Sequence, residues 1–178
     1  MNAFTSPPVA AEDAPATRRF EASCQLPAAP DAVFARLDDQ TRLGAHMAKS
    51  SAMMGGGRMT FDFDAGRGMA VGSHIRMGGS AFGLRLFLDE VVTERDPPRR
   101  KVWNTVGTPR LLIIGGYAMG FTLEPEPGGS RLRVWIDFTL PKPFFGRLLG
   151  LLFAGFYARW CVRQMVADAS AAFPFAAA

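Results

Sequence analysis

A succession of short segments in which apolar and polar residues alternate constrains this chain more than any other feature. In Arg18–Leu26 every second residue is apolar, which is typical of a strand with one buried face. Six later segments have strand character and are bounded by Gly-rich or Pro-containing turns: Met59–Asp64, Ser73–Met77, Leu84–Arg95, Arg100–Val106, Leu111–Glu124 and Leu132–Leu140. The turns are too short to hold crossover helices, so the pattern predicts an antiparallel sheet.

Helical patterns occupy two places in the chain. Two short helices are expected after the first strand, at Asp31–Leu37 and Gln40–Met47, and one long helix is expected at Phe144–Phe173. The fold class is therefore α+β: a seven-stranded curved antiparallel sheet with two short helices and one long C-terminal helix. The glycines within the predicted strands, such as Gly115-Gly116, are suited to bending such a sheet.

Length and composition indicate one ordinary globular domain. The chain has 178 residues, of which 48% are hydrophobic and 20% charged, enough for a sizeable core. We expect residues 1–17 to be a disordered lead and residues 18–175 to form the domain. The lead has no basic start followed by an apolar stretch, and the chain has no run of 18 apolar residues, so we expect a cytoplasmic protein.

The cysteines and the charged residues argue against a disulfide-stabilised fold, a zinc site and nucleic-acid binding. The two cysteines, Cys24 and Cys161, are too few for a disulfide framework or a zinc site, and no metal-ligand spacing occurs. The net charge of +4 comes from scattered arginines without a nucleic-acid-binding motif, so nucleic acid is not an expected partner. Attraction to an anionic membrane surface stays open, and no cofactor or metal is expected.

Particular segments resemble the START/polyketide-cyclase superfamily of helix-grip domains (SRPBCC), which includes birch-pollen-allergen-like and lipid-transfer proteins. The similarity covers about residues 18–173. It is carried by Pro30–Phe34 (PDAVF), Glu90–Arg100 (EVVTERDPPRR), Lys101–Gly120 (KVWNTVGTPRLLIIGGYAMG) and the helical segment Tyr157–Cys161 (YARWC). The resemblance implies a cavity between sheet and long helix that holds an apolar or amphipathic small molecule. It implies no catalytic residue, because the superfamily has no universal one.

Several residues are candidates for the lining of such a cavity. Tyr117 shares a strand face with Met119 and Phe121, and Trp103 lies in the middle of a strand; Tyr and Trp each carry one hydrogen-bonding group on an apolar body. The two histidines, His46 and His74, are candidate general bases. Asp89 and Glu90 face opposite sides of their strand, and the pattern leaves open which one faces inward, where a carboxyl would have a raised pKa.

The long helix is apolar on more than one side. One stripe is expected to face the sheet and consists of Leu151, Gly155, Ala158, Val162, Met165, Val166, Ala169 and Phe173. A second row, Leu149, Phe153, Phe156 and Trp160, lies roughly opposite. We expect Phe153 and Phe156 to line the cavity, and a homodimer face or a membrane-contacting face are the alternatives.

The sequence therefore predicts binding of a hydrophobic or amphipathic small molecule, such as a lipid, a polyketide or an aromatic metabolite. The first alternative is an enzyme of the polyketide cyclase or dehydratase type, a lyase or isomerase, in which His46, His74, Asp89 or Tyr117 moves a proton. The second is a module that contacts a protein or a membrane through the aromatic face of the long helix.

Overall fold

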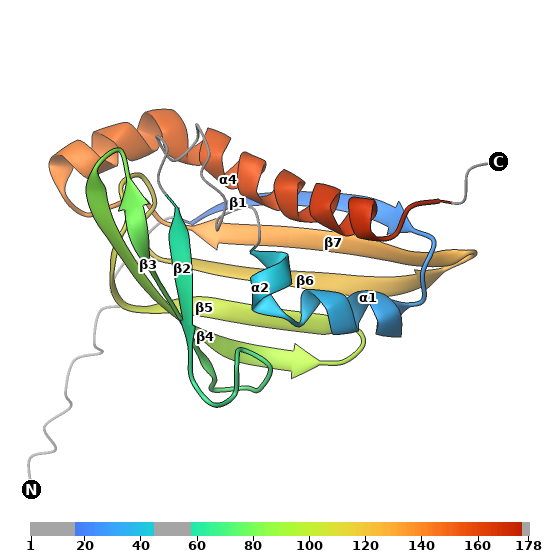
Figure 1. The fold of residues 1–178 in the computed structure, drawn as a ribbon. Helices are drawn as coiled ribbons and strands as arrows, with labels where there is room; N and C mark the ends of the chain where they lie inside the picture. Colours follow the sequence, from blue (N-terminus) through green and yellow to red (C-terminus); the bar gives the residue numbers. More distant parts are fainter. Residues whose placement is uncertain (1–16, 45–57, 176–178) are drawn as a thin grey trace, which may run out of the picture.

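The computed structural model describes residues 17–44 and 58–175. Within these ranges the sheet has the seven strands that the sequence predicts, and Figure 1 shows how they are arranged. All neighbouring strands are antiparallel, in the order β1-β7-β6-β5-β4-β3-β2. The strands are β1 (Arg18–Leu26), β2 (Met59–Phe63), β3 (His74–Ala81), β4 (Leu84–Asp96), β5 (Arg100–Arg110), β6 (Tyr117–Glu126) and β7 (Gly129–Phe138). The first strand lies beside the last, and the remaining strands follow one another as a meander.

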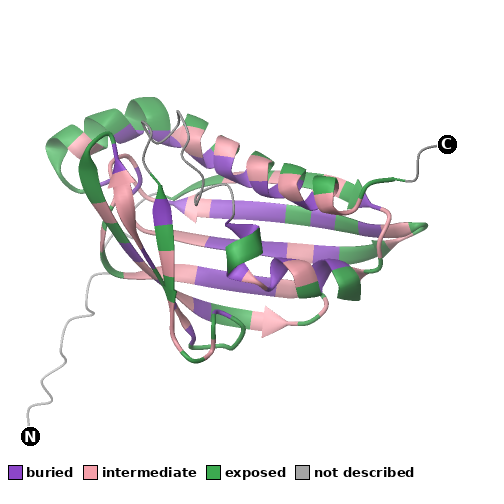
Figure 2. Ribbon diagram, viewed as in Figure 1, coloured by how far each residue is buried: buried purple, intermediate pink, exposed green. Residues whose placement is uncertain are grey.

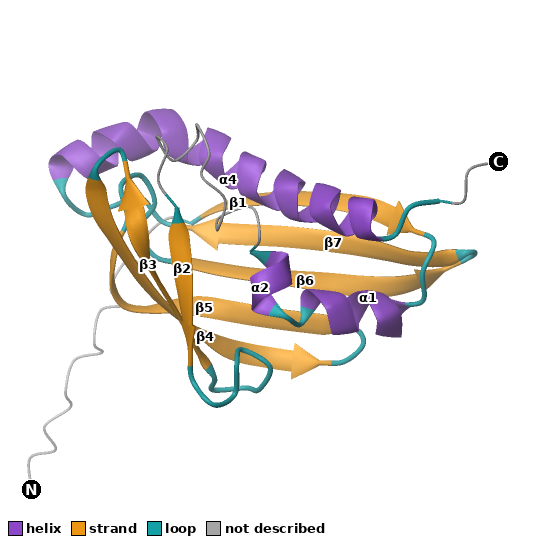
Figure 3. Cartoon of the chain, viewed as in Figure 1, coloured by secondary structure: helices purple, strands orange, loops and turns teal. Residues whose placement is uncertain are grey.

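The helices lie together on one side of the sheet, as Figure 3 shows. They are α1 (Pro30–Leu37), α2 (Gln40–Leu43) and α4 (Phe144–Ala172). The long helix α4 packs on β1 and β7, whereas α1 packs on β6 and α2. No helix in the described ranges is long and apolar enough to cross a membrane. The expected α+β fold of a curved antiparallel sheet with two short helices and one long helix is confirmed.

The short helices begin where local chemistry favours it. Pro30 occupies the first turn of α1, where its missing N–H removes no helical hydrogen bond, and Val33, Phe34 and Leu37 form the buried side. The side chain of Asp39 caps α2 by accepting a hydrogen bond from the backbone N–H of Thr41 at 2.9 Å. The expected end of the second helix at Met47 lies outside the described residues.

The strand expected at Leu111–Glu124 is interrupted in the structure. Residues 111–116 connect β5 to β6 without belonging to either strand, and β6 begins at Tyr117. The backbone N–H of Gly115 donates to the carbonyl of Thr139 at 2.8 Å, which fixes this connection to the end of β7. The Gly115-Gly116 pair therefore lies at the end of the connection, directly before β6 begins, and not within a continuous strand.

The face of α4 that packs on the sheet differs in part from the expected stripe. In the second half of the helix, Val162, Met165, Val166 and Ala169 are buried as predicted. In the first half, Gly150 and Ala154 are buried, whereas Leu151 is half exposed. A Cβ atom on Gly150 would lie 2.6 Å from the carbonyl oxygen of Ile113, so only a residue without a side chain fits there. The first half of α4 thus packs on the rest of the domain through small residues, and Figure 2 shows most of this half as exposed.

Candidate functional site

A cavity of about 140 Å³ lies between the sheet, α2 and α4. Its wall is mostly apolar and is built from six strands (β2 to β7), the 111–114 connection, α2 and α4. The lining side chains that carry a polar group are Gln40, Glu90, Trp103, Tyr117, Tyr157 and Cys161. The apolar side chains around them include Met59, Phe61, Met77, Phe82, Leu86, Leu88, Leu111, Ile114, Met119 and Ile136. The lining includes no Lys, Arg or His from the described residues.

Strand alternation directs Glu90 into this cavity. Leu88, Glu90 and Val92 occupy alternate positions of β4 and are all buried, with Glu90 only 2% exposed. Asp89 consequently faces the other side of the sheet. The sequence left the choice between Asp89 and Glu90 open, because apolar residues lie on both sides of this strand.

Glu90 forms a hydrogen-bonded cluster with two aromatic residues from neighbouring strands. The hydroxyl group of Tyr117 on β6 donates to Glu90 Oε1, and the Trp103 indole on β5 also hydrogen-bonds to this carboxyl group. Burial, reinforced by the negative charge of Asp89, raises the pKa of Glu90 from its ordinary value to about 7. Burial beside Glu90 also raises the pKa of Tyr117 well above its ordinary value. Glu90 is therefore an acid that exchanges its proton near neutral pH.

Three further polar side chains line the same cavity from the helices. Tyr157 and Cys161, one turn apart on α4, hydrogen-bond to each other, and burial raises the pKa of the Cys161 thiol to about 12. Cys161 is thus a neutral thiol. Gln40 on α2 is 5% exposed, and its side-chain Nε2 atom has no hydrogen-bond partner among the described residues.

The structure places the predicted site residues in three different environments. Trp103, Tyr117 and Met119 line the cavity. Phe121 is not among the residues that line the cavity. It is fully buried in the core, where its ring packs edge-on against Phe34 with centroids 5.5 Å apart. His46 lies outside the described residues.

The expected positions of His74, Phe153 and Phe156 in the cavity wall are wrong. His74 lies on the opposite face of β3 from the buried Ile75, and its Nδ1 atom is 3.0 Å from Asp89 Oδ1 on the outer side of the sheet. Phe153 and Phe156 are mostly exposed, because Gly150 and Ala154 occupy the inward side of the helix. The sequence alone did not separate these two sides, since both are apolar.

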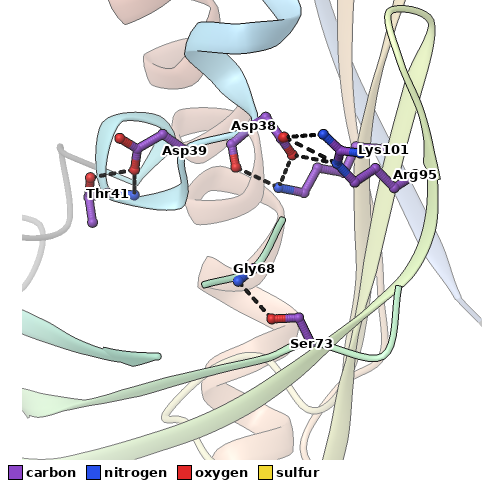
Figure 4. A network of polar contacts seen from close by, with 7 residues as sticks. All are labelled: Asp38, Asp39, Thr41, Gly68, Ser73, Arg95 and Lys101. Atoms are coloured by element: carbon purple, nitrogen blue, oxygen red, sulfur yellow. Dashed lines mark hydrogen bonds and ion pairs between the residues drawn. The ribbon is translucent and has the colours of Figure 1, made fainter. Parts of the chain in front are cut away.

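A second buried cluster joins the short helices to the sheet (Figure 4). The Nζ atom of Lys101 is fully buried and lies 2.8 Å from Asp38 Oδ1, and it also donates to the Asp38 carbonyl at 2.7 Å. Arg95 completes the cluster with an N–O distance of 2.7 Å to Asp38. Burial lowers the pKa of Lys101, whereas the two cations hold the pKa of Asp38 below its ordinary value against the effect of burial. This cluster holds α1 and α2 on the sheet beside the cavity. No pattern in the sequence marks it, because its three residues are far apart along the chain.

Solved structures with the same architecture come from diverse sources. A protein from Thermus thermophilus is 17% identical with a TM-score of 0.61, covering 88% of this chain and 100% of the other. The di-domain ARO/CYC protein BexL of the BE-7585A biosynthetic pathway is 16% identical with a TM-score of 0.62, covering 90% of this chain and 51% of the other. Ara h 8.0201 is 15% identical with a TM-score of 0.57, covering 88% and 99%. These similarities establish the helix-grip fold.

The sequence itself carries the family assignment. A comparison with curated proteins finds no match to this chain. The family described as polyketide cyclase/dehydrase and lipid transport matches residues 17–169, which is nearly the whole described domain. The chain therefore belongs to the polyketide cyclase/dehydrase and lipid transport family, within the superfamily that its sequence resembles.

Proposed function

We propose that this protein binds an uncharged, largely apolar small molecule in the cavity between its sheet and α4. The observation that carries the proposal is the composition of the wall, where apolar side chains surround one hydrogen-bonded polar cluster and no described cation is present. A ligand carboxylate or phosphate would find no described counter-charge there and would approach Glu90, which is itself acidic. A lipid alcohol, a neutral polyketide or an aromatic metabolite needs no counter-charge and is not repelled by Glu90.

The polar groups of the wall supply orientation and selectivity. A hydroxyl or carbonyl group of the ligand can exchange hydrogen bonds with Glu90 and Tyr117. The Nε2 atom of Gln40, which has no partner among the described residues, offers a further donor. Apolar contact supplies most of the affinity: burying about 250 Å² of ligand surface contributes about 6 kcal/mol before the cost of association. The family description, which includes lipid transport, agrees with this type of ligand.

The direct test is native mass spectrometry of the protein purified from its own host under mild conditions, followed by organic extraction and identification of any released molecule. We expect a bound, neutral, mainly apolar molecule. As a control, Ala81→Phe places a large side chain in the wall, whereas Ala32→Phe adds the same side chain on the exposed side of α1. The proposal predicts that only the first substitution abolishes the mass shift; a molecule retained equally by both variants would contradict it.

A second candidate is proton-transfer catalysis on a bound polyketone, which the pKa of Glu90 favours. A group with a pKa of about 7 can accept and return a proton near neutral pH, and the cavity excludes most water from it. The structural similarity to a protein named as an ARO/CYC supports the same candidate. An enzyme of this kind would show a rate that changes with an apparent pKa near 7, and Glu90→Gln would abolish turnover while retaining substrate binding. Unchanged turnover in Glu90→Gln would exclude this role for the residue.

A further inference from the structure

One end of the molecule exposes far more large apolar surface than the rest. We call it the apolar end and define it by eight residues of α4 and three of the β3–β4 hairpin: Phe144, Phe145, Leu148, Leu149, Leu151, Leu152, Phe153 and Phe156, with Phe82, Leu84 and Phe87. Each of these side chains is between 45% and 78% exposed. Single exposed apolar residues need no explanation, but a group of this size indicates an interaction surface.

The apolar end adjoins the mouth of the cavity. Phe82 is 65% exposed and is also one of the residues that line the cavity. Ile113 lines the cavity as well, and its backbone carbonyl lies directly under Gly150 of α4. The exposed first half of α4 and the hairpin therefore border the same opening, and Figure 1 shows both at the same end of the molecule.

The hairpin presents its aromatic residue at an energetic cost. Phe82 and Gly83 form the two-residue turn between β3 and β4, and both have positive φ, 51° and 77°. Asn or Gly at the first position would adopt this conformation with little strain, whereas Phe does so at a cost. A large apolar residue at a strained, solvent-exposed position is a feature typical of a functional contact.

The chain segments that form this surface carry positive charges only. The sequence has no Asp or Glu between residues 76 and 88, between 97 and 123, or between 138 and 167. These stretches contain the exposed cations Arg85, Arg110, Lys142 and Arg147, and none of the four forms an ion pair within the described residues. The partner of this surface should therefore be apolar and negatively charged.

We propose that the apolar end docks on the surface of an anionic lipid bilayer. The first half of α4 and the tip of the β3–β4 hairpin enter the boundary between head groups and acyl chains, and the cations lie against the anionic head groups. A second copy of the chain is a poorer partner, because a two-fold dimer through this face would place the same unpaired cations opposite one another. Docking in this orientation directs the mouth of the cavity toward the bilayer.

Vesicle co-sedimentation with the full chain tests this proposal. Phosphatidylcholine vesicles are compared with vesicles that also contain phosphatidylglycerol, each at low and at high salt. We expect binding to the anionic vesicles, at least about tenfold weaker binding to the neutral ones, and weakening by salt. Absence of binding to the anionic vesicles would overturn the proposal.

Two pairs of matched variants locate the contact. Phe156 and Phe175 are both 64% exposed, but only Phe156 belongs to the apolar end. Phe156→Ser should weaken binding about tenfold or more, because one buried Phe contributes about 1.5–3 kcal/mol, and Phe175→Ser should not change it. Arg147→Glu should weaken binding, whereas Arg133→Glu on the exposed side of β7 should do so much less.

Equal effects within either pair would contradict the proposed orientation. Sedimentation velocity without vesicles identifies the alternative: a dimer that Phe156→Ser dissociates, together with no vesicle binding, would assign the surface to a second copy and overturn the proposal. Phe156 does not line the cavity, so Phe156→Ser should lose vesicle binding but still retain the co-purifying molecule in native mass spectrometry. Failure of the membrane proposal is thus distinguishable from failure of the proposed ligand binding.

Discussion

At the scale of single residues, Glu90 determines much of what this cavity can do. It is a buried carboxyl group held by Tyr117 and Trp103 in a wall that is otherwise largely apolar. The sequence predicted Tyr117 and Trp103 as cavity residues, because aromatic residues with one polar group in mid-strand suit such a wall. It did not select Glu90. The side of β4 that faces inward depends on how the strand packs between β3 and β5, and the apolar pattern of β4 alone does not reveal this packing.

The raised pKa of Glu90 makes stability depend on pH in a defined direction. Between the unfolded value of 4.5 and the folded value of about 7, the folded state keeps a proton that the unfolded state releases. The contribution of Glu90 to the free energy of unfolding therefore falls as pH rises through this window, by about 3 kcal/mol in total, and is constant on either side.

Glu90→Gln should remove this contribution to the pH dependence. Urea unfolding of both proteins at several pH values between 4 and 8 measures it, and the stability of the wild type relative to Glu90→Gln should decrease with pH. A difference that stays constant across this range would mean that Glu90 titrates at the same pH in both states.

The buried Lys101–Asp38 ion pair gives a second prediction at this scale. Lys101→Met leaves the carboxylate of Asp38 buried with only Arg95 as a charged partner, and should lower the free energy of unfolding by about 3 kcal/mol. Arg99 and Asp96 have the same N–O distance of 2.8 Å, but the Arg99 side chain is 72% exposed, so Arg99→Met should cost less than about 1 kcal/mol. Equal losses in chemical denaturation would show that burial does not strengthen the first pair.

At the scale of secondary structure elements, the alternation of apolar and polar residues located the strands of the sheet. It did not give the start of β6 or the buried side of the first half of α4. Strand β1 has the predicted bounds, and β2, β4 and β7 lie close to theirs, because a period of two identifies a strand wherever one face is buried. In α4, Leu151 and Phe153 satisfy the helical pattern as well as Gly150 and Ala154 do. The choice between them depends on how closely the 111–116 connection approaches, which is a long-range contact.

Two glycines of α4 test that explanation. Gly150→Ala brings a Cβ atom to 2.6 Å from the Ile113 carbonyl oxygen and should destabilise the protein, despite the higher helix propensity of Ala. At Gly155 the nearest atom, on the ring of Phe20, is 3.5 Å away, so Gly155→Ala should stabilise the protein by up to about 1 kcal/mol. Thermal unfolding that shows the same sign for both substitutions would contradict the observed packing of this helix.

At the scale of the whole molecule, the fold combines an apolar cavity with an apolar end that borders its mouth. The position of the cavity follows from the helices lying across one face of a curved sheet, and the resemblance to helix-grip domains predicted it. The exposed surface beside it could be recognised in the sequence only as an excess of apolar residues in one helix. Whether those residues face inward or outward is decided by tertiary packing.

The central claim is that the cavity binds uncharged apolar molecules, and a displacement titration tests it most directly. A neutral fluorescent dye such as Nile red is bound to the protein and displaced by decan-1-ol or by decanoate, which differ only in the polar group. The wall of the cavity predicts that decan-1-ol displaces the dye at a concentration at least about tenfold lower than decanoate does, and that Ala81→Phe abolishes this preferential displacement. Equal or stronger displacement by decanoate, or undiminished preferential displacement in Ala81→Phe, would contradict the claim.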